Sequence, residues 1–352
     1  MKVLRENKKG FLDFFPAPRF LGMPAPALAV SDSSVRFIEL EKAKKGLTVK
    51  RYGKEVMPEG IVVSGQIKDS EALSKILGGF RKNHDIKHIR STLPEEKGYV
   101  FTAELPANSS KDLRTSVEFI IEENVPLSVS EVVFDYDILK IGDVTSNDGI
   151  HVSVSVIPID AVNMYLDVFH SAGLSPLHFE LESQAVSRSV VPANIRQPVL
   201  VIHLCRSKIG FYIVYGGAVN FSSTTSIDLA PIISEDSLKK AKGREDIKKE
   251  DALIFYPAAA NIKSEMDKVF LFWESQKDKW GEKGEDIGHI IVCGSYADVP
   301  GIRHYASNNG ISAEVANVWV NAFSFENYIP PIPSSQALGY SSVIGLVLPR
   351  GR

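Results

Sequence analysis

The chain has 352 residues, of which 44% are hydrophobic and 24% are charged, and its formal net charge is −3. This length allows two lobes with separate hydrophobic cores. The charge balance argues against a general binder of nucleic acid or anionic membrane, because such proteins concentrate positive charge on one surface. No apolar run reaches the ~20 residues of a membrane-spanning helix. Prolines and charges interrupt residues 11–26, which excludes a signal peptide there. We therefore expect a cytoplasmic protein.

Cysteine and histidine usage predicts neither a disulfide framework nor a metal site. Cys205 and Cys293 each lie inside an apolar run, which indicates buried, reduced thiols. The eight histidines show no ligand spacing, so no metal ligand is predicted. The sequence has no nucleophile elbow, Ser-His-Asp set or P-loop, and no catalytic residue is assigned.

The first 23 residues are rich in prolines and aromatic residues. Three prolines before Pro26 prevent a continuous helix, so we expect an extended arm over residues 1–23. Such an arm can dock on the protein's own body, on a partner or on a membrane. Packing on the body is favoured, because single short apolar arms bind bilayers weakly.

The first half of the chain predicts alternating strands and helices. The stretch ALAVSDSSVRFIEL reads as a strand over 27–30, a polar turn and a strand over 35–40. A helix over 73–80 follows, with Asp69 and Ser70 at its N-cap. Asp160 is expected to cap a helix that ends at Gly173. Between these two helices we expect strands over 86–94, 98–105, 130–139 and 151–158 and a helix over 113–121.

The second half repeats this order. Residues 198–225 again give strand, polar turn, strand, glycine turn and strand. This repeat predicts an α/β fold of two similar lobes. The near-continuous apolar strands over 28–31 and 199–204 are expected at the centre of their sheets, because such runs suit burial on both faces. The remaining predicted segments are a mixed-charge stretch over 237–252, a helix from about Ala260, a strand entering a glycine turn over 288–302, and a short helix ending at Pro349.

Six stretches share an order and spacing with a known family. They are SSVRFIEL, RSTLP, LRTSVEFIIEENVPLSVSEVVFDYDIL, SAGLSPLHFELESQAVSR, GSYADVPGI and SSVIGLVL. Together they resemble the PilM family of type IV pilus assembly proteins, an actin-like family related to the cell-division protein FtsA. The resemblance covers about residues 24–348 and implies a duplicated actin-like (ribonuclease H-like) fold. It implies lobe one over 24–196, with a small subdomain inserted at about 91–149, and lobe two over 197–348.

The resemblance also places three nucleotide-binding loops whose chemistry is lost. The acid and the glycine of the first loop fall on Ala29 and Ser31. Those of the second loop fall on His203 and Cys205, and Tyr296 stands in a third loop that is glycine-rich in the family. ATP and magnesium are the family's cofactors, but none is expected here. The implied, degenerate nucleotide site comprises Ser31, Asp32, Ser33, Ser34, Arg36, Cys205, Arg206, Ser207, Gly294, Ser295 and Tyr296.

Three further polar residues have alternative interpretations. Gln184 stands near the place where actin-like ATPases orient the attacking water, but a structural role is favoured. Glu180 and Glu182 alternate at a strand end, where a solvated edge or a hinge contact is favoured over a paired-carboxylate site. The competing hypothesis is an active ATP-binding, actin-like ATPase whose metal is held by displaced ligands such as Asp32 and Glu180.

The resemblance implies a non-catalytic scaffold of a type IV pilus assembly or related secretion machine. The scaffold would bind the N-terminal tail of a PilN-like inner-membrane protein and reach the inner face of the membrane only through it. A segment over 91–139 is expected to form one wall of a peptide groove. Self-association is a second partner hypothesis, and no nucleic acid is expected. The candidate partner-binding residues are Thr92, Leu93, Arg114 and Val117.

Overall fold

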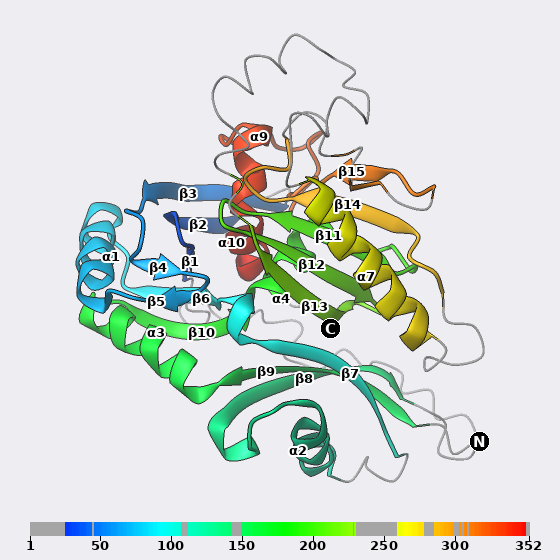
Figure 1. Ribbon diagram of the computed structural model, residues 1–352. Helices are drawn as coiled ribbons and strands as arrows, with labels where there is room; N and C mark the ends of the chain where they lie inside the picture. Colours follow the sequence, from blue (N-terminus) through cyan, green and yellow to red (C-terminus); the bar gives the residue numbers. More distant parts are fainter. Residues whose placement is uncertain are drawn as a thin grey trace, which may run out of the picture.

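Two five-stranded sheets with the same strand order form the body of the protein (Figure 1). In each sheet the central strand has two parallel strands on one side and an antiparallel hairpin on the other. This duplication confirms the predicted pair of α/β lobes. The computed structural model describes residues 25–43, 46–106, 112–141, 149–227, 229, 259–277, 285–298, 303, 306–307 and 310–349.

Lobe one contains the sheet β10-β6-β1-β2-β3. Its strands are β1 (Ala27–Val30), β2 (Ser34–Ala43), β3 (Gly46–Val56), β6 (His88–Leu93) and β10 (Ser175–Leu181). Helices α1 (Ser70–His84) and α3 (Ile159–Ser171) pack against each other beside this sheet. Two short strands, β4 (Val62–Val63) and β5 (Gln66–Ile67), form a separate hairpin. Strand β1 lies at the centre, as predicted from its apolar run.

Lobe two contains the sheet β13-β12-β11-β14-β15. Its strands are β11 (Val199–Leu204), β12 (Lys208–Tyr215), β13 (Ala218–Ser226), β14 (His289–Cys293) and β15 (Ala313–Val315). Every residue of the central strand β11 is buried, which confirms the second central-strand prediction. Helix α7 (Ala259–Lys277) lies across the sheet and contacts β12 (Figure 1).

Two helices, α4 (Glu182–Val190) and α10 (Ser341–Val347), lie between the lobes. Helix α10 packs on α4 and on β1, β2 and β6 of lobe one, while α4 contacts β12 and β13 of lobe two. The short helix α9 (Ser334–Ala337) leads through a 3₁₀ turn (Leu338–Tyr340) into α10. The two helices approach closely at Gly345, where an added Cβ would collide with the carbonyl oxygen of Ala185. They thereby join both sheets into one hydrophobic core.

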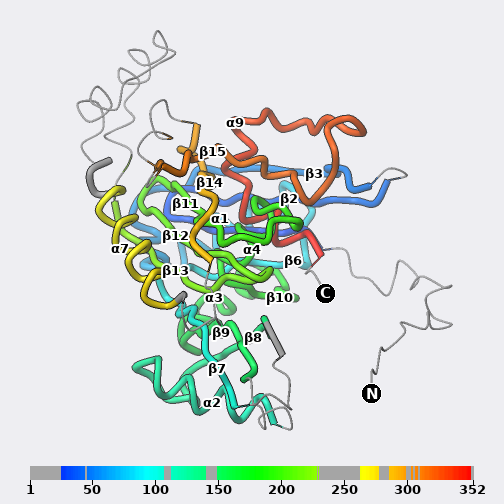
Figure 2. Tube along the Cα trace, turned by 90° about the vertical axis from the view of Figure 1, so that its right-hand side faces the viewer, coloured from blue at the N-terminus to red at the C-terminus, as the bar shows by residue number. Residues whose placement is uncertain are grey.

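A third sheet, β7-β9-β8, forms a small subdomain that projects from the lobes (Figures 1 and 2). Its elements are β7 (Tyr99–Leu105), α2 (Leu113–Asn124), a 3₁₀ turn (Val129–Glu131), β8 (Val132–Ile141) and β9 (Ile150–Pro158). It has its own core, which includes Val117, Ile121 and Val154. The observed extent differs from the predicted 91–149 at both ends, because β6 joins the lobe-one sheet and β9 joins the small one. Strand-forming residues do not reveal which sheet a strand enters.

Helix ends follow most of the predicted signals. The Asp69 carboxylate accepts a hydrogen bond from the Ala72 backbone N–H at 2.9 Å and caps α1, as expected. Helix α3 instead starts at Ile159 without a side-chain cap, so the predicted cap at Asp160 is wrong. Asp160 lies in the first turn of α3, where its negative charge interacts favourably with the positive end of the helix dipole. Gly173, with φ of +76°, follows the helix end as predicted.

The arm over 1–23 and the mixed-charge stretch over 237–252 lie outside the described residues. No helix in the described part of the chain is long and apolar enough to cross a bilayer.

Candidate functional site

A cleft of about 220 Å³ between the lobes collects the predicted nucleotide-loop residues. It lies where the β1–β2 turn, the β11–β12 turn and the loop after β14 meet. Gly294 directly precedes the wall residue Ser295 and has φ of +95°. The structure therefore brings the three predicted loops together. The predicted residues in its walls are Ser31, Asp32, Ser33, Ser34, Arg36, Cys205, Arg206, Ser207, Ser295 and Tyr296.

The first turn is closed by its own side chains. The Ser31 hydroxyl donates to the Ser34 carbonyl oxygen at 3.0 Å and accepts from the Ser34 backbone N–H at 3.2 Å. The Asp32 carboxylate accepts from the Ser207 hydroxyl at 2.7 Å and from the Ser64 backbone N–H at 3.0 Å. Asp32 therefore joins a turn of lobe one to a turn of lobe two.

Lys208, the first residue of β12, places a buried ammonium group in the cleft. Its Nζ lies 2.6 Å from Glu182 Oε2 and 2.9 Å from Glu96 Oε2, and all three side chains are only 11–12% exposed. Burial alone lowers the pKa of Lys208, but the two carboxylates outweigh it and hold that pKa well above its ordinary value. Burial raises the pKa of Glu182, but the Lys208 ammonium beside it outweighs burial and leaves that pKa below its ordinary value. A charged ion-pair network therefore crosses between the lobes.

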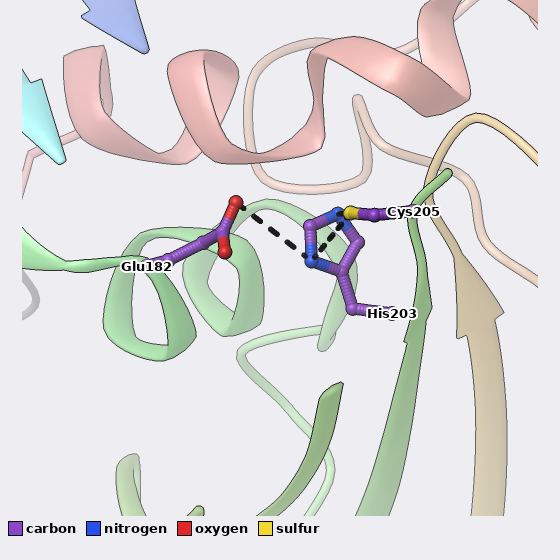
Figure 3. Close-up of side chains that lie close together, drawn as sticks. All are labelled: Glu182, His203 and Cys205. Carbon is purple, nitrogen blue, oxygen red and sulfur yellow. Dashed lines mark hydrogen bonds and ion pairs between the residues drawn. The ribbon is translucent and has the colours of Figure 1, made fainter. Parts of the chain in front are cut away.

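Glu182, His203 and Cys205 form a compact cluster beside this ion pair (Figure 3). His203 Nδ1 lies 4.0 Å from Glu182 Oε1 and 3.7 Å from Cys205 Sγ. Burial lowers the pKa of His203 to about 4 and raises the pKa of Cys205 to about 12. At neutral pH the imidazole is therefore uncharged and the thiol keeps its proton.

Two further cations, Arg36 and Lys54, line the cleft. The Arg36 guanidinium donates to the Ser295 hydroxyl at 3.0 Å and lies 5.9 Å from the centre of the Tyr340 ring. Lys54 is the cross-strand neighbour of Arg36 in the β2–β3 pair. Burial, and the charge of Arg36, lower the pKa of Lys54. This wall of the cleft is therefore positive.

Deep in the same region, Glu95 is a buried carboxyl group. Its Oε2 accepts a hydrogen bond from the Ser183 backbone N–H at 2.9 Å. Burial raises the pKa of Glu95 above its ordinary value, despite hydrogen bonds that act in the opposite direction.

These donors do not fit the magnesium–nucleotide pair that the resemblance implies. Magnesium prefers an octahedral shell of oxygen ligands from carboxylates, phosphates and water. The positions expected to carry acids hold Ala29 and His203, and the Glu182 carboxylate already binds the Lys208 ammonium. No phosphoryl-transfer step follows from this arrangement.

The other polar candidates have structural partners. Gln184 Nε2 donates to the Ser155 hydroxyl of β9 at 2.8 Å, in keeping with the favoured structural role. Glu180 is buried and forms an ion pair with Arg188. A solvated edge is therefore wrong for Glu180 and Glu182, whereas the hinge-contact alternative fits Glu182. Glu180 does not line the cleft with Asp32, so the structure does not bring the displaced metal ligands together.

The predicted partner-binding residues do not form one surface. Thr92 and Leu93 are buried at the end of β6 and line the interlobe cleft. Val117 is fully buried in the small core, because the apolar face of α2 turns inward, so its side chain cannot touch a docked partner. Arg114 is exposed, with its guanidinium 4.7 Å from the centre of the Phe134 ring. Of the four, only Arg114 has an exposed side chain, and its role in partner binding stays a prediction.

The prediction missed Glu96, Lys208 and Lys54. A pair of acids directly after TLP and a lysine that begins an apolar run were the available signals. Neither of these short sequence patterns distinguishes a residue of a buried ion pair from a charged residue in solvent.

The chain is similar to pilus assembly proteins in sequence and fold. A family model described as type IV pilus assembly protein PilM matches residues 27–211. The solved structure of a PilM–PilN type IV pilus biogenesis complex aligns with a TM-score of 0.69 and 15% identity, covering 92% of this chain and 97% of that chain. The ethanolamine utilization protein EutJ from Carboxydothermus hydrogenoformans aligns with a TM-score of 0.50 and 10% identity, covering 93% and 89%. No curated protein matches the sequence.

At these identities the structural matches show the fold alone, and they confirm the predicted actin-like architecture. The family match spans more than half of the 352 residues. The chain therefore belongs to the type IV pilus assembly protein PilM family.

Proposed function

We propose that this protein is a scaffold that binds the N-terminal tail of a PilN-like inner-membrane protein and does not hydrolyse ATP. The observation that supports the absence of ATP hydrolysis is the Lys208 ammonium, which forms ion pairs with Glu96 and Glu182 in the cleft. Phosphoryl transfer requires a metal ion that bridges phosphate oxygens and neutralises the developing charge. Here Ala29 and His203 stand at the two positions where the resemblance places acids, and Lys208 pairs with Glu96 and Glu182, so the all-oxygen ligand set that magnesium prefers is not assembled.

Phosphate release with ATP and magnesium tests the absence of hydrolysis. We expect the rate with wild-type protein to equal that of a no-protein control. The double variant Ala29→Asp/His203→Asp restores the family's two acids, but Lys208 and Tyr296 still occupy the cleft, so we expect no turnover from it either. Wild-type turnover well above the control would contradict the proposal.

Support for the partner comes from the fold of the small subdomain. Its sheet has two edges, and β7 lies against β13 of lobe two, which leaves β8 as the edge away from that contact. Val133 and Ile138 on β8 are about half exposed, at 48% and 44%. An extended peptide can add to such an edge through main-chain hydrogen bonds, with side-chain contacts providing specificity. The PilM–PilN complex, similar in fold, supports a PilN-like tail as that peptide.

The scaffold would then be recruited to the inner face of the membrane by its partner. Binding of a fluorescent peptide, made from the N-terminal residues of the PilN-like protein encoded beside this chain, tests this. We expect saturable binding, weakened at least about tenfold by Ile138→Asp or Arg114→Glu. Ile329→Asp is the matched control, because Ile329 is an 81% exposed apolar residue distant in sequence from the small subdomain. Undetectable binding, or equal weakening by the control, would contradict the proposal.

Self-association stays a prediction. Sedimentation of the purified full chain over a range of concentrations would measure it.

A further inference from the structure

Glu182, His203 and Cys205 bring three different metal-ligating atoms to one point of the cleft. A carboxylate oxygen, an imidazole nitrogen and a thiol sulfur all lie within 4.8 Å of one another. In Figure 3 the dashed lines from Glu182 and Cys205 both reach the His203 ring, which lies between the other two side chains. The three side chains also line the cleft, so an ion has a route to them.

The spacing is close to that of a tetrahedral zinc site. Zinc bonds of 2.0–2.3 Å place neighbouring ligand atoms about 3.4–3.6 Å apart. The observed separations from His203 Nδ1 are 3.7 Å to Cys205 Sγ and 4.0 Å to Glu182 Oε1. Cys205 Sγ also lies 3.6 Å from His203 Nε2, so the sulfur is about equally near both ring nitrogens. A turn of the imidazole ring, with shifts of the other two side chains, would direct one nitrogen to an ion shared with Cys205 and Glu182.

We propose that Glu182, His203 and Cys205 form a binding site for a zinc-class divalent ion, with the fourth position open to the cleft. Sulfur and imidazole ligands select zinc over magnesium or calcium, which require oxygen ligands. On binding, the Cys205 S–H bond breaks, a zinc–sulfur bond forms, and the proton passes to the solvent. This inference does not depend on the PilN-like partner.

Neighbouring groups support the ligands. Ser341 Oγ lies 3.4 Å from His203 Nε2, the ring nitrogen that does not face Glu182, and can fix the ring orientation. Lys208 binds Glu182 Oε2, which leaves Oε1 on the side of His203. With a Cys205 thiolate, the negative charges of Cys205, Glu96 and Glu182 offset those of Lys208 and a divalent ion, while Arg36 adds a further positive charge near the site.

The ion would join the two lobes directly. Glu182 begins α4 at the end of lobe one, whereas His203 and Cys205 belong to β11 and its following turn in lobe two. Zinc bound here would therefore fix the interlobe arrangement without any nucleotide.

Cobalt and zinc titrations of the metal-stripped full chain test the site. Co²⁺ accepts the same ligands as Zn²⁺, and a thiolate ligand gives it an intense charge-transfer absorption. We expect this band at one equivalent of Co²⁺ and its disappearance on addition of Zn²⁺. Zn²⁺ should also raise the midpoint of thermal unfolding, and Mg²⁺ should not.

Variants assign the ligands. We expect Cys205→Ser to abolish the band and Glu182→Gln to weaken Co²⁺ binding about tenfold or more. Cys293→Ser is the matched control, because Cys293 is the other free thiol and lies on the adjacent strand, outside the cluster. Circular dichroism of the metal-free variants verifies their folding.

Two results would overturn the proposal. One is the absence of the thiolate band in the wild-type chain, which is decisive even where a variant does not fold. The other is a band that survives Cys205→Ser or is lost in Cys293→Ser.

Discussion

Replacing Lys208 with methionine removes a buried charge while keeping most of the side-chain volume. In the wild type its ammonium forms ion pairs with two carboxylates, those of Glu96 and Glu182, at 2.9 and 2.6 Å. Removing one partner of a buried ion pair leaves an uncompensated charge, which costs about 3–5 kcal/mol. We therefore expect Lys208→Met to lower the free energy of unfolding by about 3–5 kcal/mol.

The chain length sets the corresponding thermal shift. An unfolding entropy of about 2.1 cal/mol/K per residue, over 352 residues, converts this loss into a fall in the midpoint of roughly 4–7 °C. Calorimetry or circular dichroism of the metal-free protein at pH 7 measures it. Adding Glu182→Gln to Lys208→Met should recover part of the loss, because one stranded charge is then gone.

Lys50→Met is the matched control. Lys50 also lies 2.6 Å from a carboxylate, that of Glu39, but its side chain is 45% exposed. Glu39 is buried, at 8% exposure, but it keeps Arg51 as a second partner. Losing the exposed Lys50 should therefore cost only about 0–1 kcal/mol, and this variant should unfold almost as the wild type does. If Lys208→Met costs no more than Lys50→Met, the buried network is not what stabilises the cleft.

Four further substitutions test the packing and the buried acid. Gly345→Ala forces a Cβ against the Ala185 carbonyl oxygen and should lower the free energy of unfolding by about 1–3 kcal/mol. Gly79→Ala in α1, where a Cβ meets nothing within 4 Å, should raise it by about 0.5–1 kcal/mol. Equal effects of the two variants in denaturant titrations would refute this difference. The raised pKa of Glu95 stabilises the folded protein below the unfolded-state pKa, and this stability is lost as pH rises through the folded-state pKa. Glu95→Gln should therefore flatten the decline of the unfolding free energy above about pH 4.5. An unchanged slope would refute this. Ile121→Ala in the small core should cost about 2–5 kcal/mol and raise amide exchange mainly in β7, β8 and β9; uniform acceleration across both lobes would show that the subdomain does not open separately.

The sheet arrangement was predictable because burial leaves a clear pattern in the sequence. The apolar runs of β1 and β11 indicated burial on both faces, and both strands are central. The resemblance to the PilM family implied that Ala29 and His203 stand where that family has acids, and this assignment stays a prediction.

The ion pairs in the cleft were not predictable, because charged residues are mostly exposed and a sequence does not reveal their partners. Lys208 and Glu96 are 112 positions apart in the sequence and meet only in the folded protein. For the same reason, the cluster of Glu182, His203 and Cys205 has no spacing motif, since its ligands come from two elements of different lobes. Val117 was an unsuitable partner-binding candidate because it belongs to the apolar face of α2, which packs into the small core.

The position of α10 has a consequence for biosynthesis. This helix, at residues 341–347, covers β1, β2 and β6 of lobe one, although more than 240 positions separate it from those strands. At a synthesis rate of about 5–20 residues per second, α10 is therefore made on the order of tens of seconds after the strands of lobe one that it covers. During that interval the apolar surface of β1 and β2 is available to chaperones, and premature termination before residue 341 would leave it uncovered.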